Sequence, residues 1–291
     1  MKLMVTGASG FIGWRACVLL REAGHEVIPV TRPESRRRAA SAELDFVRID
    51  AGDPAIRDLL AGCDAVFHFA GQPSPAGARE DPAGAVRENA GTTLNLLEAC
   101  EEHGAGLIYP SSVRAAMDPP PDPYAMSKRL GEHACRVHPA RATILRMSSI
   151  FGPGQVAWEG ATGAIAAFAA RAIDGEPIVI PGDPRRTRDF LYVDDLVPAL
   201  AEIVTGERWN QTLTVASGVN TPLIEAAELV VKTLGSDTPI ETPGGDLAPG
   251  ENESYDTGAG LRVHARPLDS AVKSYVDWLR RHPAAQGRAR A

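Results

Sequence analysis

A tyrosine and a lysine stand four positions apart in the segment DPYAMSKRLGE, at Tyr124 and Lys128. In a helix these two side chains share one face. A free phenol has a pKa of about 10, and a neighbouring ammonium favours its ionised form, so the pair has the chemistry to exchange a proton with a bound molecule. The same spacing also occurs on solvated helix surfaces without any role, and the surrounding sequence has to decide between the two interpretations.

A glycine turn follows the first apolar segment, with Gly7, Gly10 and Gly13 in TGASGFIG. It opens the amphipathic segment FIGWRACVLLREAG. A tight glycine turn between a strand and a helix lets a pyrophosphate approach the backbone, where free N–H groups and the positive end of the helix meet its charge. The position of the turn predicts dinucleotide binding, and an ordinary strand-to-helix turn is the alternative.

The end of the second apolar segment, EVIPVTRPESRRR, bears on the choice of dinucleotide. NAD sites usually carry an acidic residue there to hold the ribose hydroxyls, whereas this chain has Thr31 and Arg32. Arg32 can hold a 2′-phosphate, and Arg36, Arg37 and Arg38 are further cationic candidates. This favours NADP(H), while NAD(H) stays possible and a solvated basic loop is the alternative interpretation.

Short apolar runs alternate with amphipathic segments through the first 150 or so residues, which is a βαβ pattern. Runs such as AVFHFA lack period-two alternation, as expected for parallel strands covered on both faces. We therefore expect an α/β fold with a Rossmann-type doubly wound parallel sheet over residues 1–151 and 190–217. A smaller α/β substrate domain, interleaved in sequence, is expected over 152–189 and 218–282, with a frayed tail at 283–291.

Composition excludes several classes of protein. The chain has 291 residues, a formal charge of -7 and 44% hydrophobic residues, with no apolar run long enough for a membrane span. The acidic balance argues against nucleic acid, which Lys and Arg bind by neutralising phosphates. Four widely spaced cysteines fit buried or free thiols in a reducing compartment and no zinc or other metal site, and MKLMVTGASG lacks the features of a signal peptide, so we expect a cytoplasmic protein.

Further motifs occur in order over nearly the whole chain: Asp50 in ID, FHFAG at 67–71, Asn89 in NAGTTLNLLEAC, Ser111 and Ser112, ILRMSSIFGPGQ at 144–155 and RRTRDFLYVDDL at 185–196. With these motifs, the glycine turn and YAMSK, the chain resembles the extended short-chain dehydrogenases/reductases. That family includes nucleotide-sugar epimerases, dehydratases and ketoreductases.

The resemblance implies a catalytic set of Ser112, Tyr124 and Lys128. Tyr124 would act as the general acid in reduction while the cofactor carries the hydride. Lys128 and an oxidised nicotinamide would both favour the phenolate, and Lys128 would also hold the nicotinamide ribose. Ser112 would hydrogen-bond the reacting oxygen, with Ser111 as the fallback for that role.

The resemblance also implies binding residues and a homodimer through the helices that carry Asn89 and Tyr124. For Asn89, capping a helix or bonding to backbone is an equally good explanation. The expected substrate-binding residues are Ser111, Ser149 and Arg188, where Arg188 would clamp a diphosphate. The expected cofactor-binding residues are Gly7, Ser9, Gly10, Phe11, Ile12, Gly13, Thr31, Arg32, Asp50, Ala51, Phe69, Ala70, Gly71, Asn89, Tyr124 and Lys128.

Three departures from the family pattern bear on the reaction. Residues 113–123 form a shortened loop between Ser112 and Tyr124, and no Asp-Glu pair follows the serine, which disfavours a 4,6-dehydratase. Ser149 and Ala248 stand where relatives often have an Asn and an Arg that bind the substrate diphosphate. We expect an NADPH-dependent reductase of a keto group on a nucleotide-activated deoxysugar. The alternatives are a nucleotide-sugar epimerase with tightly bound NAD and a non-catalytic cofactor-sensing regulator.

Overall fold

The computed structural model describes residues 1–35, 44–255, 257, 261–286 and 288. The chain divides into two compact units, and each unit combines two separate stretches of sequence. The first consists of Met1–Met147 and Leu196–Val215, and the second of Ser148–Asp195 and Ala216–Ala291. The borders between the two units therefore fall after residues 147, 195 and 215, whereas the sequence analysis placed the domain borders after residues 151, 189 and 217.

Parallel strands form the centre of the first unit. Neighbouring strands of this unit pair in parallel, and the order reverses at β1, which lies between β4 and β2. Such a reversal opens a crevice at the carboxyl ends of the strands. The expected Rossmann-type doubly wound sheet is thus confirmed. In spatial order the strands are β10 (Thr212–Ala216), β6 (Ala142–Met147), β5 (Gly106–Ser112), β4 (Ala65–His68), β1 (Lys2–Thr6), β2 (Glu26–Thr31) and β3 (Val47–Arg48).

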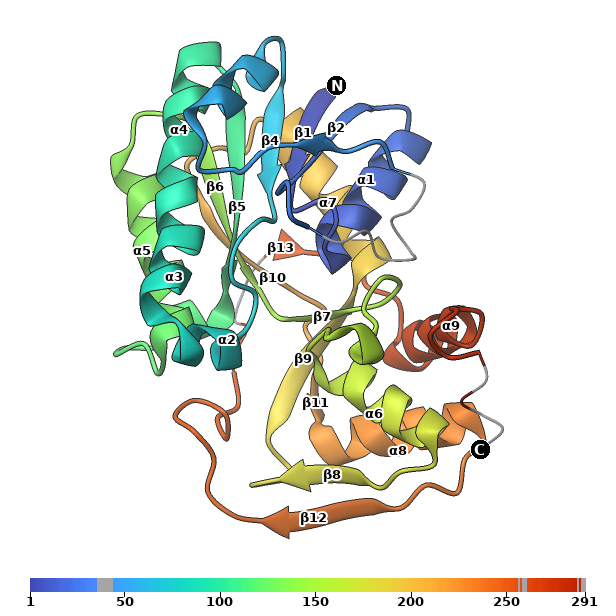
Figure 1. Cartoon of the computed structure of the whole chain (residues 1–291). Coiled ribbons are helices and arrows are strands. Elements are labelled where there is room, and N and C mark those ends of the chain that lie inside the picture. The colour runs from blue at the N-terminus through green and yellow to red at the C-terminus, as the bar shows by residue number, and fades with distance from the viewer. Residues whose placement is uncertain (36–43, 256, 258–260, 287, 289–291) are drawn as a thin grey trace. The chain divides into compact units, whose positions relative to one another are not determined.

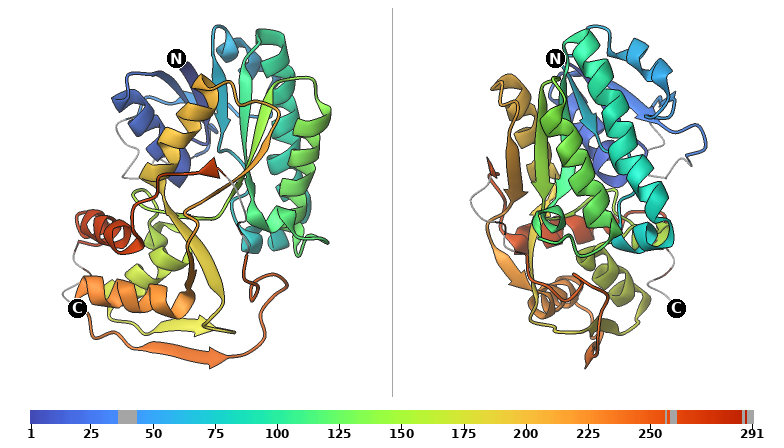
Figure 2. Two further views of the ribbon diagram at one scale, coloured as in Figure 1. Left: turned by 180° about the vertical axis from the view of Figure 1, so that it is seen from behind. Right: turned by 90° about the vertical axis from the view of Figure 1, so that its left-hand side faces the viewer.

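Helices cover both faces of this sheet. Figure 1 shows α4 (Thr92–His103) and α5 (Pro123–Val137) over one face, and α1 (Phe11–Glu22) and α7 (Val193–Thr205) over the other, and the views in Figure 2 agree. Every residue of β4 and β5 is buried, which explains their continuous apolar runs. The remaining helical elements of the unit are Pro54–Leu60, α2 (Pro75–Glu80), α3 (Pro82–Val86), a π-helical turn at Arg87–Gly91 and a 3₁₀ turn at Val113–Ala116.

The second unit is a smaller α/β assembly. Strand β9 (Thr187–Tyr192) pairs in parallel with β7 (Ser149–Phe151) and antiparallel with β11 (Asn220–Pro222). A separate parallel pair joins β8 (Ile178–Pro181) to β12 (Ile240–Gly244). The other elements of this unit are a 3₁₀ turn at Ala157–Glu159, α6 (Ala164–Asp174), α8 (Leu223–Leu234), β13 (Leu261–Arg262) and α9 (Leu268–Leu279).

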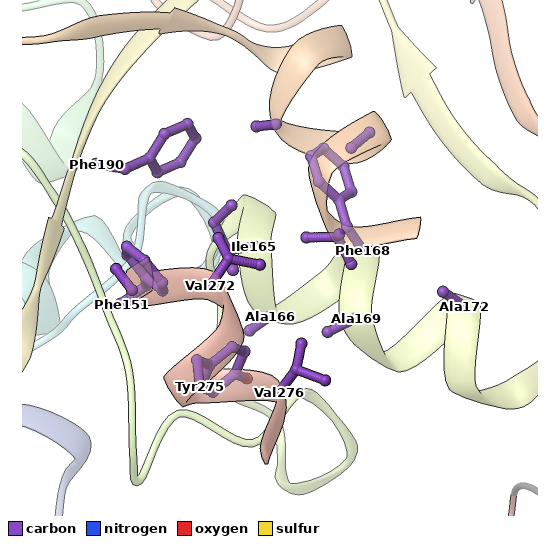
Figure 3. Packing of buried hydrophobic residues seen from close by; sticks show 14 of the residues in the cluster. Phe151, Ile165, Ala166, Phe168, Ala169, Ala172, Phe190, Val272, Tyr275 and Val276 are labelled. Carbon is purple, nitrogen blue, oxygen red and sulfur yellow. The ribbon is translucent and has the colours of Figure 1, made fainter. Parts of the chain in front are cut away.

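Aromatic side chains organise the core of the second unit. Figure 3 shows Phe151 and Phe190 near the side chains of α6 and α9. The ring of Phe151 meets those of Phe190 and Tyr275 edge-on, with centroids 6.3 Å and 6.1 Å apart. The Tyr275 hydroxyl donates to the backbone carbonyl of Gln155 at 2.6 Å, so this buried phenol is satisfied. These contacts tie β7, β9 and α9 together.

Described residues of the expected frayed tail contact the second unit. Ala285 is buried, and the Arg288 guanidinium lies 5.0 Å from the Trp158 ring centroid and 3.4 Å from an Asp174 carboxylate oxygen. A small, basic composition does not reveal such partners in advance, because they come from a distant part of the chain. Among the helices that the structure describes, every one is too short or too polar to cross a lipid bilayer.

The four cysteines, Cys17, Cys63, Cys100 and Cys135, are free and buried. Burial raises the pKa of Cys17, Cys100 and Cys135 to about 12. Since the thiolate is the reactive form, these thiols pack as small apolar groups.

Candidate active site

Backbone contacts close the glycine turn after β1 so tightly that side chains have no room there. Gly7 has a φ of +68°, and a Cβ on it would lie 2.5 Å from the Phe69 carbonyl. A Cβ on Gly13 would lie 2.3 Å from the Gly7 carbonyl oxygen. Gly10 precedes α1 as an N-cap without a capping side chain, and Phe11 and Ile12 begin the helix. A helix N-terminus behind a bare glycine turn fits a dinucleotide pyrophosphate.

The end of β2 joins the glycine turn to a charged cluster. The hydroxyl groups of Ser9 and Thr31 hydrogen-bond at 2.6 Å, which fixes the turn to the strand. The half-exposed Arg32 guanidinium lies 3.3 Å from a carboxylate oxygen of Glu34 and 3.4 Å from one of Glu88. A 2′-phosphate at Arg32 would therefore compete with two carboxylates that the sequence alone did not place there. The candidates Arg36, Arg37 and Arg38 lie outside the described residues.

The residues expected to line the adenine and the rest of the cofactor follow β3 and β4. The Asp50 carboxylate accepts the Gly52 N–H at 2.7 Å, and the carbonyl of the buried Ala51 accepts a bond from the Asn95 amide at 2.8 Å. Phe69, Ala70 and Gly71 directly follow β4. The local turns are thus held by hydrogen bonds at the strand ends, where a doubly wound sheet binds its ligand.

Asn89 is buried in the π-helical turn and joins three segments. Its amide nitrogen donates to the Gln72 carbonyl at 3.1 Å and to the Ser127 hydroxyl at 2.9 Å. Its amide oxygen has no hydrogen-bond partner among the described residues, and a Cβ on Gly71 would lie 2.3 Å from that oxygen. Asn89 therefore bonds to backbone and to α5 without capping a helix, and its free acceptor suits a donor on a bound cofactor.

The expected catalytic set lies together at the end of β5 and the start of α5. Ser112 ends β5, and its side chain hydrogen-bonds Tyr124, which lies in the first turn of α5. Lys128 is buried one helical turn later; its ammonium donates to the Pro110 carbonyl at 2.9 Å and lies 6.0 Å from the centroid of the Tyr124 ring. The three side chains therefore lie together. An exposed surface pair without a role does not explain this arrangement of Tyr124 and Lys128.

Burial shifts both titrating groups toward their neutral forms. It raises the pKa of Tyr124 to about 12, against smaller lowering effects of the Ser112 hydrogen bond and the Arg114 charge. Burial also lowers the pKa of Lys128 to about 8. The phenol is thus protonated at neutral pH when only the charges of the protein act on it. The phenolate expected from the sequence needs an additional positive charge, such as that of an oxidised nicotinamide.

Ser111 does not reach the catalytic set. Its hydroxyl donates to the buried Glu132 carboxylate at 2.6 Å, and Glu132 also binds Arg146 and Arg136 at 2.7 Å and 2.8 Å. Glu132 lies on α5 about two helical turns beyond Tyr124, so the Ser111 hydroxyl is engaged away from the phenol. This bond argues against Ser111 as a fallback for Ser112, and its contact with the substrate stays a prediction.

Two residues beside Tyr124 escaped the sequence analysis. The Arg114 guanidinium donates to the Asp122 carboxylate, and both residues are buried. Asp122 also caps α5 by accepting the Ala125 N–H at 2.8 Å. An Asp directly before a Pro is a helix-start signal that was present in the sequence. Nothing in the sequence indicated Arg114.

The second unit holds the other two expected substrate residues. Ser149 begins β7 and is half-buried, opposite Phe190 of β9. The Arg188 guanidinium donates to the carbonyls of Thr187 and Glu251 at 2.8 Å and 3.0 Å and also to that of Glu253. It covers the Tyr255 ring, with 4.7 Å to the centroid. Arg188 therefore anchors the segment around 251–255, a role that the sequence did not predict.

Comparison with known proteins decides the family. Residues 3–212 match the model of the NAD dependent epimerase/dehydratase family. The chain belongs to this family. It is an extended short-chain dehydrogenase/reductase, as its motifs predicted, and hence an enzyme that uses a nicotinamide dinucleotide.

Relatives of the chain carry out different reactions. A UDP-glucose 4-epimerase of Mycolicibacterium smegmatis is 26% identical over 100% of this chain and 97% of its own length. A dTDP-4-dehydro-6-deoxy-D-allose reductase of Streptomyces bikiniensis is 27% identical over 96% of both chains. The crystal structure of the Thermotoga maritima UDP-glucose 4-epimerase with UDP-glucose superimposes with a TM-score of 0.83 at 25% identity, covering 96% of this chain and 99% of that one.

Proposed function

We propose that the chain reduces a keto group on a nucleotide-linked deoxysugar, with Tyr124 as the proton donor. The observation that carries the proposal is the grouping of Ser112, Tyr124 and Lys128, with the Tyr124 phenol hydrogen-bonded to the Ser112 side chain. Because burial raises the pKa of Tyr124 to about 12, the phenol keeps its proton at neutral pH. That is the form required to turn a carbonyl oxygen into a hydroxyl group.

Each residue of the set has a separate task. Tyr124 gives its proton to the carbonyl oxygen, and the Ser112 hydroxyl hydrogen-bonds the same oxygen. The Lys128 ammonium, 6.0 Å from the ring centroid, stabilises the phenolate that remains until water reprotonates it. When bound, the nicotinamide supplies the hydride for the carbonyl carbon. Asn89 offers its free amide oxygen to the cofactor, and the turn at Gly7 receives the pyrophosphate.

A nucleotide sugar is the proposed substrate because of the family and because of Arg188 in the second unit. Its guanidinium already donates hydrogen bonds to backbone carbonyls. A diphosphate bound at Arg188 would compete with those of the 251–255 segment for the same N–H groups. Ser149 and Ala248 replace an amide and a guanidinium with weaker or absent donors. We therefore propose that this chain holds the nucleotide diphosphate more weakly than relatives that have both groups.

NADPH is the proposed hydride donor because Arg32, directly after β2, stands in the place of an acidic residue. Glu34 and Glu88 offset part of its charge, so we propose a modest preference over NADH. Neither Thr31 nor Arg32 accepts a pair of bonds from ribose hydroxyls as a carboxylate does.

A nucleotide-sugar epimerase with bound NAD is the second candidate. Relatives that are UDP-glucose 4-epimerases match this chain over 96–100% of its length, and the carboxylates at Arg32 disfavour an additional phosphate. A cofactor-sensing regulator is the third, and the intact Ser112, Tyr124 and Lys128 speak against it, because sensing does not require a proton donor.

The decisive experiment follows absorbance of the reduced nicotinamide while purified protein meets NADPH and a panel of nucleotide-linked 4-keto sugars. The reductase predicts stoichiometric NADPH oxidation with one member of the panel. Release of NAD on denaturation of the purified protein, with interconversion of sugar epimers and no net oxidation, would establish the epimerase. Cofactor binding with neither outcome would favour the regulator.

We also propose that a second copy of this chain covers α4 and α5. Leu94 on α4 and Met126 and Leu130 on α5 are 45%, 43% and 40% exposed, and Met126 and Leu130 are one helical turn apart. Exposed apolar side chains on neighbouring helices are typical of protein interfaces. Leu130→Asp should shift the protein from dimer to monomer in sedimentation velocity, and a parent chain that is already monomeric would refute the proposal.

A further inference from the structure

The residues between Ser112 and Tyr124 are braced from within by Arg114. The Ser112 hydroxyl oxygen accepts the backbone N–H of Arg114 at 3.2 Å. The side chain of the same arginine hydrogen-bonds the Asp122 carboxylate, two residues before Tyr124. Arg114 thus holds the serine with its backbone and the start of the tyrosine helix with its guanidinium.

We propose that Arg114 and Asp122 are a positioning pair that holds Ser112 and Tyr124 in the geometry for proton transfer. This inference rests on the proposed function of Tyr124. Asp122 is suited to the task because its carboxylate has two uses, as it caps α5 at the Ala125 N–H and also binds Arg114. Arg114 and Asp122 both lie in the loop of residues 113–123. Because this loop is short, a displacement of either residue moves Ser112 or Tyr124.

Stability alone does not account for a buried pair at this place. The side chains of Arg114 and Asp122 are 9% and 2% exposed, and removing two charges from water offsets most of their attraction. The loop also has an independent anchor in Arg129, which donates to the carbonyls of Ala115 and Met117 and lies 3.1 Å from the Asp118 carboxylate. Arg129 therefore provides a matched control, since these contacts hold the loop without involving Ser112, Asp122 or Tyr124.

The two charges act on the phenol in opposite directions. Arg114 lowers the pKa of Tyr124 and Asp122 raises it, because a positive charge favours the phenolate and a negative charge opposes it. Lys128 from α5 and Tyr109 from β5 also face this region. Helical elements packed against α5 carry further charged or titratable groups that stay unchanged in every variant, namely Arg79, Glu80, Arg87, Glu88, Glu98, Glu101, Glu102 and His103, with Asp81 between α2 and α3.

The test compares D122N, R114Q, the double variant and R129Q. Asparagine is a good helix cap, so D122N keeps the start of α5 while removing the charge. We expect D122N and R114Q to lower kcat by about 10- to 100-fold, the order that a displacement of about one ångström costs, with KM and cofactor affinity little changed. The double variant, with two neutral amides able to bond each other, should recover part of that loss. R129Q should lose less than either single variant.

A titration of the phenol provides a readout that needs no substrate. The absorbance change of each variant on ionisation is compared with that of the same variant carrying Tyr124→Phe, which isolates one of the five tyrosines. D122N should shift the Tyr124 transition to lower pH and R114Q to higher pH. Circular dichroism at each pH confirms that the chain is folded, and R114K replaces R114Q if that variant does not fold, with kcat as its readout.

Shifts in the same direction, no shift in D122N, or equal losses of kcat in D122N and R129Q would each overturn the pairing. The outcome is separable from the proposed function. If the parent turned over no keto sugar but the transitions moved in opposite directions, the reductase would fail while the electrostatic arrangement around Tyr124 stood.

Discussion

Replacing Glu88 by Gln should raise the affinity of the protein for NADPH and leave that for NADH nearly unchanged. In the parent the Glu88 carboxylate lies 3.4 Å from the Arg32 guanidinium, which is the group proposed to hold the 2′-phosphate. Gln keeps the size of the side chain and removes its charge. The phosphate then meets one competing carboxylate, that of Glu34, in place of two.

The size of the effect follows from the exposure of these groups. The side chains of Arg32 and Glu88 are 48% and 39% exposed, so their attraction is that of a surface pair, about 0.2–1 kcal/mol. Releasing that competition should tighten NADPH binding by about 1.4- to 5-fold. A hydrogen bond to a charged group contributes about 1.5–3 kcal/mol, and subtracting the two surface pairs leaves a net gain of about 1 kcal/mol from Arg32. Arg32→Ala should therefore weaken NADPH binding about fivefold.

Calorimetric titration of NADPH and NADH into each variant measures these differences. Glu98→Gln is the matched control. Glu98 is another exposed glutamate, 3.7 Å from Arg57, and its replacement changes the net charge of the protein by the same amount as Glu88→Gln. Raising the salt concentration should reduce the effects of Arg32 and Glu88, since exposed charges are screened.

Two results would refute this reasoning. If Glu88→Gln and Glu98→Gln raised NADPH affinity equally, net charge and not competition at Arg32 would be responsible. If the parent bound NADH as tightly as NADPH and Arg32→Ala changed neither, the end of β2 would not recognise the phosphate, and the epimerase with NAD would become the better proposal.

Three further predictions concern the catalytic set and the substrate. Tyr124→Phe should lower kcat by roughly 10²- to 10⁴-fold in the keto-sugar assay with cofactor affinity retained, and near-parental turnover would remove Tyr124 from the mechanism. Because burial lowers the pKa of Lys128 to about 8, kcat should fall as the pH rises through about 8, and Lys128→Arg, which stays charged, should move that fall upward; an unmoved profile would assign it to another group. Arg188→Ala should weaken nucleotide-sugar binding and also loosen the 251–255 segment in hydrogen exchange, whereas unchanged affinity in calorimetry would leave Arg188 a purely structural role.

The first unit was predictable because its signals are local and repeated. Buried parallel strands read as continuous apolar runs, and β4 and β5 are buried along their whole length. The turn at Gly7 was predictable for a similar reason, because only glycine accepts both the positive φ and the backbone approach of Phe69. The interleaving of the domains was expected because the segment TLTVAS at 212–217 was interpreted as a strand that returns to the first sheet, and Thr212–Ala216 pairs in parallel with β6.

Partners that come from distant parts of the chain were not predictable in this way. The sequence identifies Arg32 as a cation at a strand end, but Glu88 approaches it from a position 56 residues away. Arg188 likewise has the side chain of an anion clamp, yet it donates to carbonyls more than 60 residues away. A side chain's chemistry can be read from its type, whereas its availability depends on contacts that only the fold creates.

Ser111 and Ser112 show how that distinction limits a motif. The two residues have the same side chain, adjoin each other in β5, and were assigned overlapping roles. In the fold, the Ser111 hydroxyl bonds to the buried Glu132 at 2.6 Å, whereas Ser112 hydrogen-bonds Tyr124. Both partners lie on α5, about two helical turns apart, so the two hydroxyl groups meet different parts of the same helix. Which residue of α5 each serine meets cannot be read from the two side-chain types, since it depends on where the strand and α5 come together in the folded chain.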